Sequence, residues 1–252
     1  MSLIDLPVNA PKPLAGRVIL LAGAHGGLGG AAAHACAAAG ATLVLLGRRL
    51  PKLNRIYDAV AQAGPEPVLY PMDLEGAGPQ DYLEMAQRLQ TEFGRLDGVL
   101  HCAADFRGLT PLEHVDPAAF ASILHVNLTA PWWMLQACLP LLRQAADPSV
   151  VVTVDAPERV GQAYWGAYGV AQHGLRALLG MLAAELAGSG IRVAGLNPGP
   201  MRTSLRAKAF ADDSSEVARD PQASAQACVE LLSSSGNRHA GQIWDLTGNP
   251  SA

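Results

Sequence analysis

The chain has 252 residues, half of them hydrophobic, and a formal net charge of −4 at pH 7. This length suffices for one large domain that buries a sheet between two layers of helices. The small net charge indicates neither a nucleic-acid-binding surface nor an acidic tail, so we expect a soluble enzyme without a nucleic-acid partner.

The N-terminal segment, MSLIDLPVNAPKPLAG, contains three prolines and no long apolar run. It resembles neither a signal peptide nor a membrane span, so we expect a cytoplasmic protein without a membrane partner. The cysteines form no CxxC pair and the histidines show no ligand spacing, which predicts free thiols and no metal site. The four cysteines are Cys36, Cys102, Cys138 and Cys228.

A predicted strand at 17–21 leads into a glycine-rich stretch, AGAHGGLG at 22–29, and an alanine-rich helical stretch follows it. Glycine at Gly23 allows a turn with positive φ, at Gly27 it lets backbone approach a pyrophosphate, and at Gly29 it lets helix pack on strand. The helix N-terminus then offers N–H groups and a positive dipole end to phosphates. A glycine cluster also occurs in tight turns before core helices, but the flanking strand and helix favour a dinucleotide site.

Strands and helices alternate along the rest of the chain. Further strands are predicted at 42–46, 67–70, 98–101, 150–154, 191–196 and 242–246, and helices at 51–62, 80–93, 117–144, 163–187 and 222–232. This series predicts a single α/β domain over residues 1–252, a Rossmann-type doubly wound parallel sheet flanked by helices on both faces. Continuous apolar runs such as SVVVTV fit strands that are covered on both faces.

Ligands on such a sheet bind beyond the carboxyl ends of the strands, so the residues that follow each strand are candidate site residues. After the second strand, Arg48 offers a guanidinium where a carboxylate would accept hydrogen bonds from an adenosine ribose. A guanidinium suits a 2′-phosphate, which predicts NADP(H) rather than NAD(H). The alternative is a solvated arginine pair on a loop.

Several motifs, in the right order and spacing, resemble the short-chain dehydrogenase/reductase family over nearly the whole chain. The family pattern TGxxxGxG appears as AGAHGGLG, with Ala22 in place of threonine, and the PG segment appears as NPGPMRT at 197–203. The helix asparagine corresponds to Asn127 and the YxxxK motif to YGVAQ, beginning at Tyr168. The NNAG motif is matched weakly, by HCAA at 101–104.

This resemblance implies an oxidoreductase that binds a nicotinamide cofactor and acts on a carbonyl or alcohol. It implies a catalytic set of Tyr168, Asn127, Asp155 and Gln172. The implied cofactor-binding residues are Gly23, His25, Gly27, Leu28, Gly29, Arg48, Asp73, Leu74, Ala103, Gln172, Pro198, Gly199 and Thr203, with Asp73 at the adenine. Residues 204–220 correspond to the family's substrate lid, and their sequence does not identify a substrate.

The family commonly forms dimers and tetramers through the helices that correspond to 117–144 and 163–187, so we expect a homodimer or homotetramer. Small and large residues alternate in the second of these helices, at Gly166, Ala167, Leu175 and Leu178. They suit close packing between helices, either across such an interface or inside the chain's own core.

Pro131 lies four residues after Asn127 inside the predicted helix at 117–144. Proline has no N–H, so the Asn127 carbonyl loses its helical partner and is free to hold a water. In the family this asparagine anchors a water that links the catalytic lysine to solvent. The alternative is a kinked core helix.

The family's catalytic set is incomplete here. Asp155 stands where the family has a serine, thirteen residues before the tyrosine, and Gln172 stands at the lysine position. A nearby ammonium would lower the pKa of Tyr168 and a nearby carboxylate raises it, so both changes make this phenol a weaker acid.

Two interpretations of Asp155 are open. In an apolar pocket it could be protonated and donate the hydrogen bond of the missing serine, or it could cap the loop that leaves its strand. Gln172 could keep a hydrogen bond to the nicotinamide ribose without the charge. Two functions follow: an oxidoreductase with altered proton-transfer groups, or a cofactor-binding protein without catalysis that acts as a sensor or assembly partner.

Overall fold

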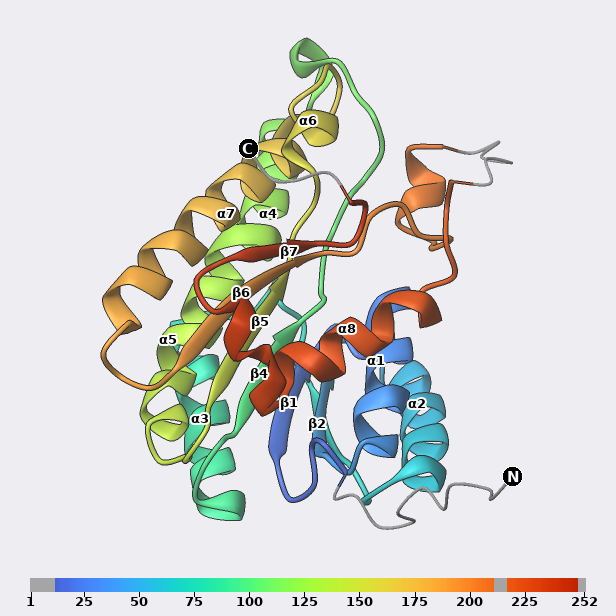
Figure 1. Cartoon of the computed structure of the whole chain (residues 1–252). Helices are drawn as coiled ribbons and strands as arrows, with labels where there is room; N and C mark the ends of the chain where they lie inside the picture. The colour runs from blue at the N-terminus through green and yellow to red at the C-terminus, as the bar shows by residue number, and fades with distance from the viewer. Residues whose placement is uncertain (1–11, 211–216, 249–252) are drawn as a thin grey trace.

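A seven-stranded sheet forms the centre of the molecule, with strand order β3-β2-β1-β4-β5-β6-β7 (Figure 1). The computed structural model describes residues 12–210 and 217–248. The strands are β1 (Val18–Ala22), β2 (Thr42–Gly47), β3 (Val68–Pro71), β4 (Gly98–His101), β5 (Ser149–Thr153), β6 (Arg192–Asn197) and β7 (Ile243–Asp245). All neighbours pair in parallel. The strand order reverses between β1 and β4, which confirms the predicted doubly wound Rossmann-type sheet.

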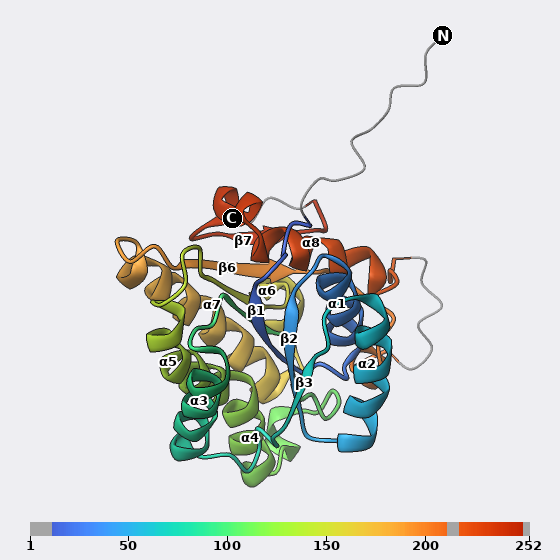
Figure 2. The same cartoon turned by 90° about the horizontal axis from the view of Figure 1, so that it is seen from below.

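Helices cover both faces of the sheet, as the two views show (Figures 1 and 2). One face carries α1 (Gly27–Ala38), α2 (Leu50–Ala63) and α8 (Gln222–Leu232). The other carries α3 (Pro79–Phe93), α4 (Pro117–Leu124), α5 (Ala130–Leu142) and α7 (Gly166–Leu186). Alternate strand residues point to opposite faces, so Val99 lies in one core and Leu100 in the other.

The helix predicted at 117–144 is two helices joined by a π-helical turn, η2 (His125–Thr129). In that turn the Ala130 N–H donates to the His125 carbonyl, five residues earlier. The sequence showed Pro131 but not this wider turn. The start of the helix predicted at 163–187 was also placed too early, because Tyr164 (φ 76°) and Gly166 (φ 49°) have positive φ.

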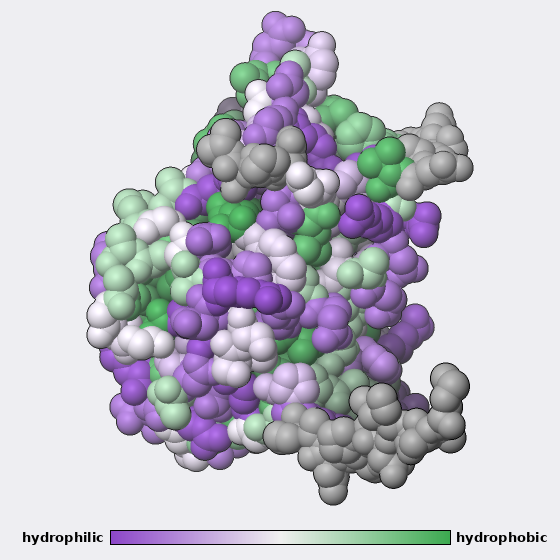
Figure 3. Space-filling model, in the orientation of Figure 1, coloured by the Kyte–Doolittle hydropathy of each residue, from purple (hydrophilic) through white to green (hydrophobic). Residues whose placement is uncertain are grey.

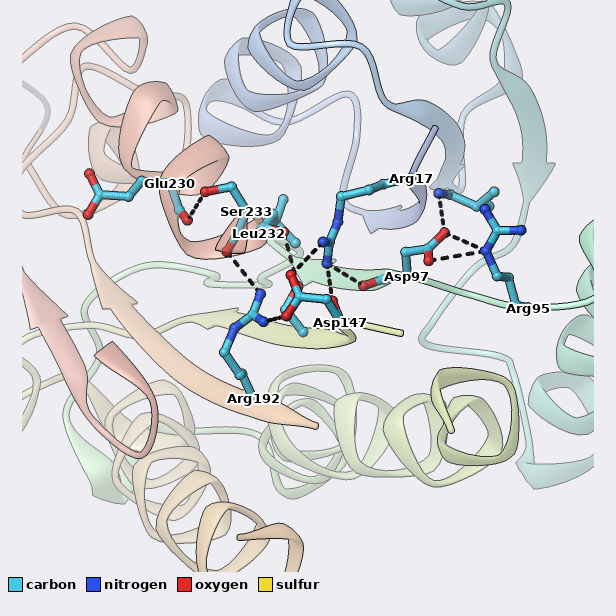
Figure 4. A network of polar contacts seen from close by, with 10 residues as sticks. Arg17, Arg95, Asp97, Asp147, Arg192, Glu230, Leu232 and Ser233 are labelled. Atoms are coloured by element: carbon cyan, nitrogen blue, oxygen red, sulfur yellow. Dashed lines mark hydrogen bonds and ion pairs between the residues drawn. The ribbon is translucent and has the colours of Figure 1, made fainter. Parts of the chain in front are cut away.

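The amino ends of the central strands are joined by an ion-pair network that contains Arg17, Asp97, Asp147 and Arg192, which we call the amino-edge network (Figure 4). Arg17 donates to an Asp147 carboxylate oxygen at 2.8 Å, and Arg192 pairs with the other oxygen. Asp97 accepts from the Val18 N–H at 2.8 Å. Burial lowers the pKa of both Arg17 and Arg192; the negative charge of Asp97 offsets part of the shift at Arg17, and the positive charge of Arg17 adds to the shift at Arg192.

On the face seen in Figure 3, hydrophobic areas alternate with hydrophilic ones. Among the large hydrophobic side chains that are exposed, Trp132 lies on α5, and Val170 and Met181 lie on α7. Ala167 and Leu175 are buried within the chain, so they serve its own core.

Over residues 12–210 and 217–248, none of the helices combines the length and hydrophobicity that crossing a membrane requires.

Candidate active site

A cavity of about 500 Å³ opens at the carboxyl ends of the strands, where the strand order reverses. It brings together most of the residues that the sequence singled out. Those that line it are Gly23, His25, Gly27, Leu28, Arg48, Asp73, Leu74, Ala103, Asp155, Tyr168, Gln172, Pro198, Gly199 and Thr203. Gly29 and Asn127 are not among the lining residues.

At three glycines of the glycine-rich loop, a side chain would collide with neighbouring atoms, and the first of them has the predicted positive φ. Gly23 has φ 81°, and a Cβ there would lie 2.6 Å from the Ala103 nitrogen. A Cβ on Gly29 would lie 2.1 Å from the Gly23 carbonyl oxygen, so Gly29 is needed for packing of helix on loop. At Gly27 the nearest atom is the Thr203 Cγ2, at 2.6 Å from such a Cβ, so this glycine makes room for Thr203.

The first turn of α1 faces this cavity with its backbone donors uncapped. Its N-cap is Gly26, no side chain caps it, and no acidic residue lies in its first turn. The first N–H groups of a helix have no partner within the helix, and the helix dipole adds positive potential there. Together with the glycine contacts, this arrangement fits the pyrophosphate of a dinucleotide.

Basic side chains gather at the β2 end of the cavity, where Arg48, Arg49 and Lys52 join His25 in its lining. Burial lowers the pKa of His25, and the positive charges of Lys52, Arg48 and Arg49 lower it further. The His25 Nδ1 is buried and has no hydrogen-bond partner in the described part of the chain. This cluster fits a 2′-phosphate, because the cations of Arg48, Arg49 and Lys52 line the same end of the cavity, where one anion can bind.

Tyr168 is buried at the other end of the cavity and its hydroxyl donates to an Asp155 carboxylate oxygen, Oδ2, at 3.2 Å. The second carboxylate oxygen, Oδ1, accepts from the Ala156 N–H at 2.7 Å and from Arg159 Nε at 3.0 Å. Arg159 Nη2 also pairs with Oδ1. Tyr168, Asp155 and Arg159 therefore form a continuous chain of polar contacts.

Asp155 accepts in each of these contacts, and an arginine pair favours the ionised carboxylate. The hydrogen bond that a protonated Asp155 would donate to a substrate stays a prediction. The predicted cap is present, since Asp155 accepts from the Ala156 N–H directly after it.

Burial raises the pKa of Tyr168 well above its ordinary value, and the negative charge and hydrogen bond of Asp155 raise it further. The positive charge of Arg159 acts in the opposite direction but does not reverse the shift. The direction agrees with the expectation from the sequence: Tyr168 holds its proton tightly.

Gln172 is buried at the lysine position, and its side-chain oxygen accepts from the Asp155 N–H at 2.9 Å. This contact fixes the backbone that carries Asp155. The predicted hydrogen bond from Gln172 to a nicotinamide ribose stays a prediction.

Asn127 clamps the loop after β4 instead of lining the cavity. Its Oδ1 accepts from the Asp105 N–H at 2.9 Å, and its Nδ2 donates to the Asp105 and Ile123 carbonyls, both at 2.8 Å. The side-chain amide is thus committed to protein contacts. Water binding by the Asn127 backbone carbonyl stays a prediction.

Aromatic rings form a wall beside Tyr168 in the same cavity. The rings of Phe106 and Trp165 stack with centroids 5.1 Å apart, and Phe106 lies 5.2 Å from the Tyr168 ring. Phe210 completes the wall, 6.3 Å from Trp165. Phe210 belongs to the predicted lid at 204–220, of which 211–216 lie outside the described residues.

The sequence did not predict a role in the site for Arg159, Arg49, Lys52 or the aromatic wall. Arg159 lies on a short helix, α6 (Pro157–Val160), that was not predicted. A signal was present: Arg159 stands four residues after Asp155, and Pro157 between them favours a helix start that would bring the two together. Lys52 and Arg49 could have been found as neighbours of Arg48 at the start of α2.

Comparison with known proteins shows the family to which the chain belongs. Residues 23–244 match the family model described as enoyl-(acyl carrier protein) reductase. The chain is 32% identical over 91% of its length to the uncharacterized oxidoreductase YciK of Escherichia coli K12, of which it covers 91%. It belongs to the short-chain dehydrogenase/reductase family.

Solved structures of this family superimpose on nearly the whole chain. A structure assigned as a short chain dehydrogenase from Pseudomonas syringae is 40% identical, with a TM-score of 0.88 over 94% of this chain and 96% of that one. Another, from Shigella flexneri 2a strain 301, was solved in complex with NADP. It is 31% identical, with a TM-score of 0.89 over 94% and 99% of the two chains.

Proposed function

We propose that this chain is an NADP(H)-dependent oxidoreductase that interconverts an alcohol and a carbonyl compound through a modified proton-transfer group. The observation that carries the proposal is the placement of the Tyr168 hydroxyl and the Asp155 carboxylate in one cavity with the glycine-rich loop. Such a cavity can hold a dinucleotide and a small substrate together, and it places a hydroxyl proton donor within it.

NADP(H) is the cofactor that these residues fit. The uncapped start of α1 would hold the pyrophosphate, and Arg48, Arg49 and Lys52 would hold the 2′-phosphate. Relatives of the same fold bind NADP and NADPH in their solved structures, in agreement with the prediction from Arg48. When bound, the nicotinamide supplies or accepts the hydride; the chain's own residues orient the substrate and move its proton.

The substrate expected for the aromatic wall is apolar next to its reacting oxygen. Phe106, Trp165 and Phe210 offer ring faces, while Tyr168 and Asp155 offer the polar groups. A pocket of this composition binds apolar groups by burial and fixes their orientation through a few hydrogen bonds.

The second candidate function is a cofactor-binding protein without catalysis, a sensor or assembly partner. The observation that favours it is the raised pKa of Tyr168, which opposes proton release from the phenol.

Oligomerisation and a cytoplasmic location stay predictions. Exposed Trp132, Val170 and Met181 on α5 and α7 support the first of these.

The test is calorimetric binding of NADPH with NADH as control, followed by turnover in both directions on a panel of ketones, aldehydes and alcohols. Tight NADPH binding with turnover by the unaltered chain supports the oxidoreductase. Tight binding without turnover, with activity restored by Gln172→Lys combined with Asp155→Ser, supports the second candidate. Failure to bind either cofactor contradicts both.

A further inference from the structure

The contacts of Asp155 define where a proton on Tyr168 can go. The Tyr168 hydroxyl donates to Asp155 Oδ2, while Arg159 and the Ala156 N–H occupy Oδ1. In the described part of the chain, the charged or titratable side chains in contact with Asp155 are Arg159 from α6 and Tyr168 from α7. One oxygen of Asp155 is thus held by a cation, and the other faces the phenol.

This arrangement treats the two reaction directions differently. While Asp155 is ionised, proton donation by Tyr168 in carbonyl reduction would leave a phenolate beside a carboxylate in a buried site, where the like charges repel, so reduction requires a proton on Asp155. In alcohol oxidation, Tyr168 can pass its own proton to Asp155 as it receives one, so that the phenol stays neutral throughout.

We propose that Asp155 is the terminal proton acceptor behind Tyr168, that Arg159 positions it and keeps it ionised, and that the site therefore oxidises alcohols at neutral pH. This inference rests on the proposed function and gives it a direction. Arg159 lines the same cavity, and in this role it is a positioning residue that acts through its contact with Asp155.

The atoms and electrons of the step balance. The alcohol carbon loses a hydride, with two electrons, to the oxidised cofactor NADP⁺, and the alcohol hydroxyl loses its proton to Tyr168 Oη. Tyr168 passes its hydroxyl proton to Asp155 Oδ2, and Asp155 later releases it to water. The products are the carbonyl compound, NADPH and one proton. By reversibility, reduction draws its proton from protonated Asp155 and is favoured by acid.

The kinetic test uses 1-phenylethanol and its ketone acetophenone as the probe pair, since the aromatic wall suits a phenyl group. Asp155→Asn keeps the shape of the side chain but cannot accept a proton. We expect it to lower kcat for oxidation about 100-fold with NADP⁺ affinity unchanged in calorimetry. The matched control is Asp147→Asn, the same substitution before the other end of β5, which should leave kcat unchanged.

Two substitutions, one that removes the positive charge of Arg159 and one that keeps it, test whether this charge acts on Asp155. Arg159→Gln should lower kcat for oxidation about 10-fold and move the acid limb of its pH profile to higher pH, because the carboxylate loses its cation. Arg159→Lys should restore much of both. A fall in kcat without movement of the pH profile would mean a merely structural role and would overturn this part of the proposal.

A readout without cofactor completes the test. In protein labelled at the tyrosine Cζ carbon, with the Tyr168 signal assigned by Tyr168→Phe, Asp155→Asn should make Tyr168 ionise at lower pH, and Arg159→Gln should not. An unchanged titration in Asp155→Asn would overturn the inference.

Failure of this inference differs from failure of the proposed function. Turnover that survives Asp155→Asn, or an oxidation rate that does not fall as the pH is lowered, would overturn the inference alone. No turnover of any substrate by the unaltered chain would overturn both.

Discussion

Strand β5 has an aspartate two residues before its start and another two residues after its end, and each is paired with arginine. Asp147, at the amino end, forms ion pairs with Arg17 and Arg192. These ion pairs connect the amino ends of β1, β5 and β6. Asp155, at the carboxyl end, is held by Arg159 and also accepts from the Tyr168 hydroxyl. Both aspartates pair with arginine. Arginines hold both carboxylate oxygens of Asp147, which fits a structural role, whereas one oxygen of Asp155 faces the Tyr168 hydroxyl and can take part in proton transfer.

The largest effect expected at the carboxyl edge is a pH-dependent loss of stability at His101. Burial lowers the pKa of His101 from 6.5 to about 4. The unfolded chain therefore binds a proton that the folded chain excludes between these values, and stability falls as pH drops through that window, by about 3 kcal/mol in total.

Urea unfolding across this pH range measures the effect, with His101→Leu as the comparison. The variant should lose this component of the pH dependence. An identical pH dependence in both proteins would show that His101 is not responsible.

The next effect concerns the cofactor. Arg48→Ala combined with Lys52→Ala should weaken NADPH binding about 100-fold, because two charged contacts to the 2′-phosphate are removed. NADH has no such phosphate, so its affinity should change little, and calorimetry with both cofactors measures the difference. Equal weakening of both would place these cations elsewhere on the dinucleotide.

At the amino edge, Asp147→Ala should destabilise the fold by about 2 kcal/mol. It leaves Arg17 and Arg192 without their carboxylate, and the side chain of Asp147 is 38% exposed, which reduces the loss below that of a fully buried pair. Urea unfolding gives the change, and NADPH affinity should not follow it. Joint loss of stability and cofactor affinity would mean that the two edges are coupled.

The smallest effect is expected at Tyr164, the one non-glycine residue with positive φ in the described part of the chain. Tyr164→Asn should stabilise the protein by about 0.5 to 1 kcal/mol, since asparagine tolerates this conformation better. Tyr164→Phe keeps the strain and serves as the control. A thermal shift of the same size in both variants would assign the effect to the lost hydroxyl.

The sequence predicted the sheet and its helices well, because continuous apolar runs and the helical stretches that alternate with them specify local structure and burial. It also predicted the glycine contacts, since steric exclusion at Gly23 and Gly29 follows from the backbone alone. The unpredicted π-turn and the start of α7 depend on backbone choices that apolar patterning does not encode. The pairing of Asp155 with Arg159 depends on α6, a helix of one turn, which is too short for a periodic signal.

The π-turn η2 also determines which face α5 presents to the sheet, because it joins α4 directly to α5. It holds about one residue more per turn than an α-helix, so it absorbs one extra residue while α5 keeps its buried face toward the sheet. Deleting one residue from 130–133, in the regular helix, would rotate everything after it by about 100°, because no π-turn there absorbs the change. Buried Met134 and Cys138 would turn away from the sheet. The π-turn can therefore absorb a difference of one residue, whereas α5 depends on its exact length to keep its buried face toward the sheet.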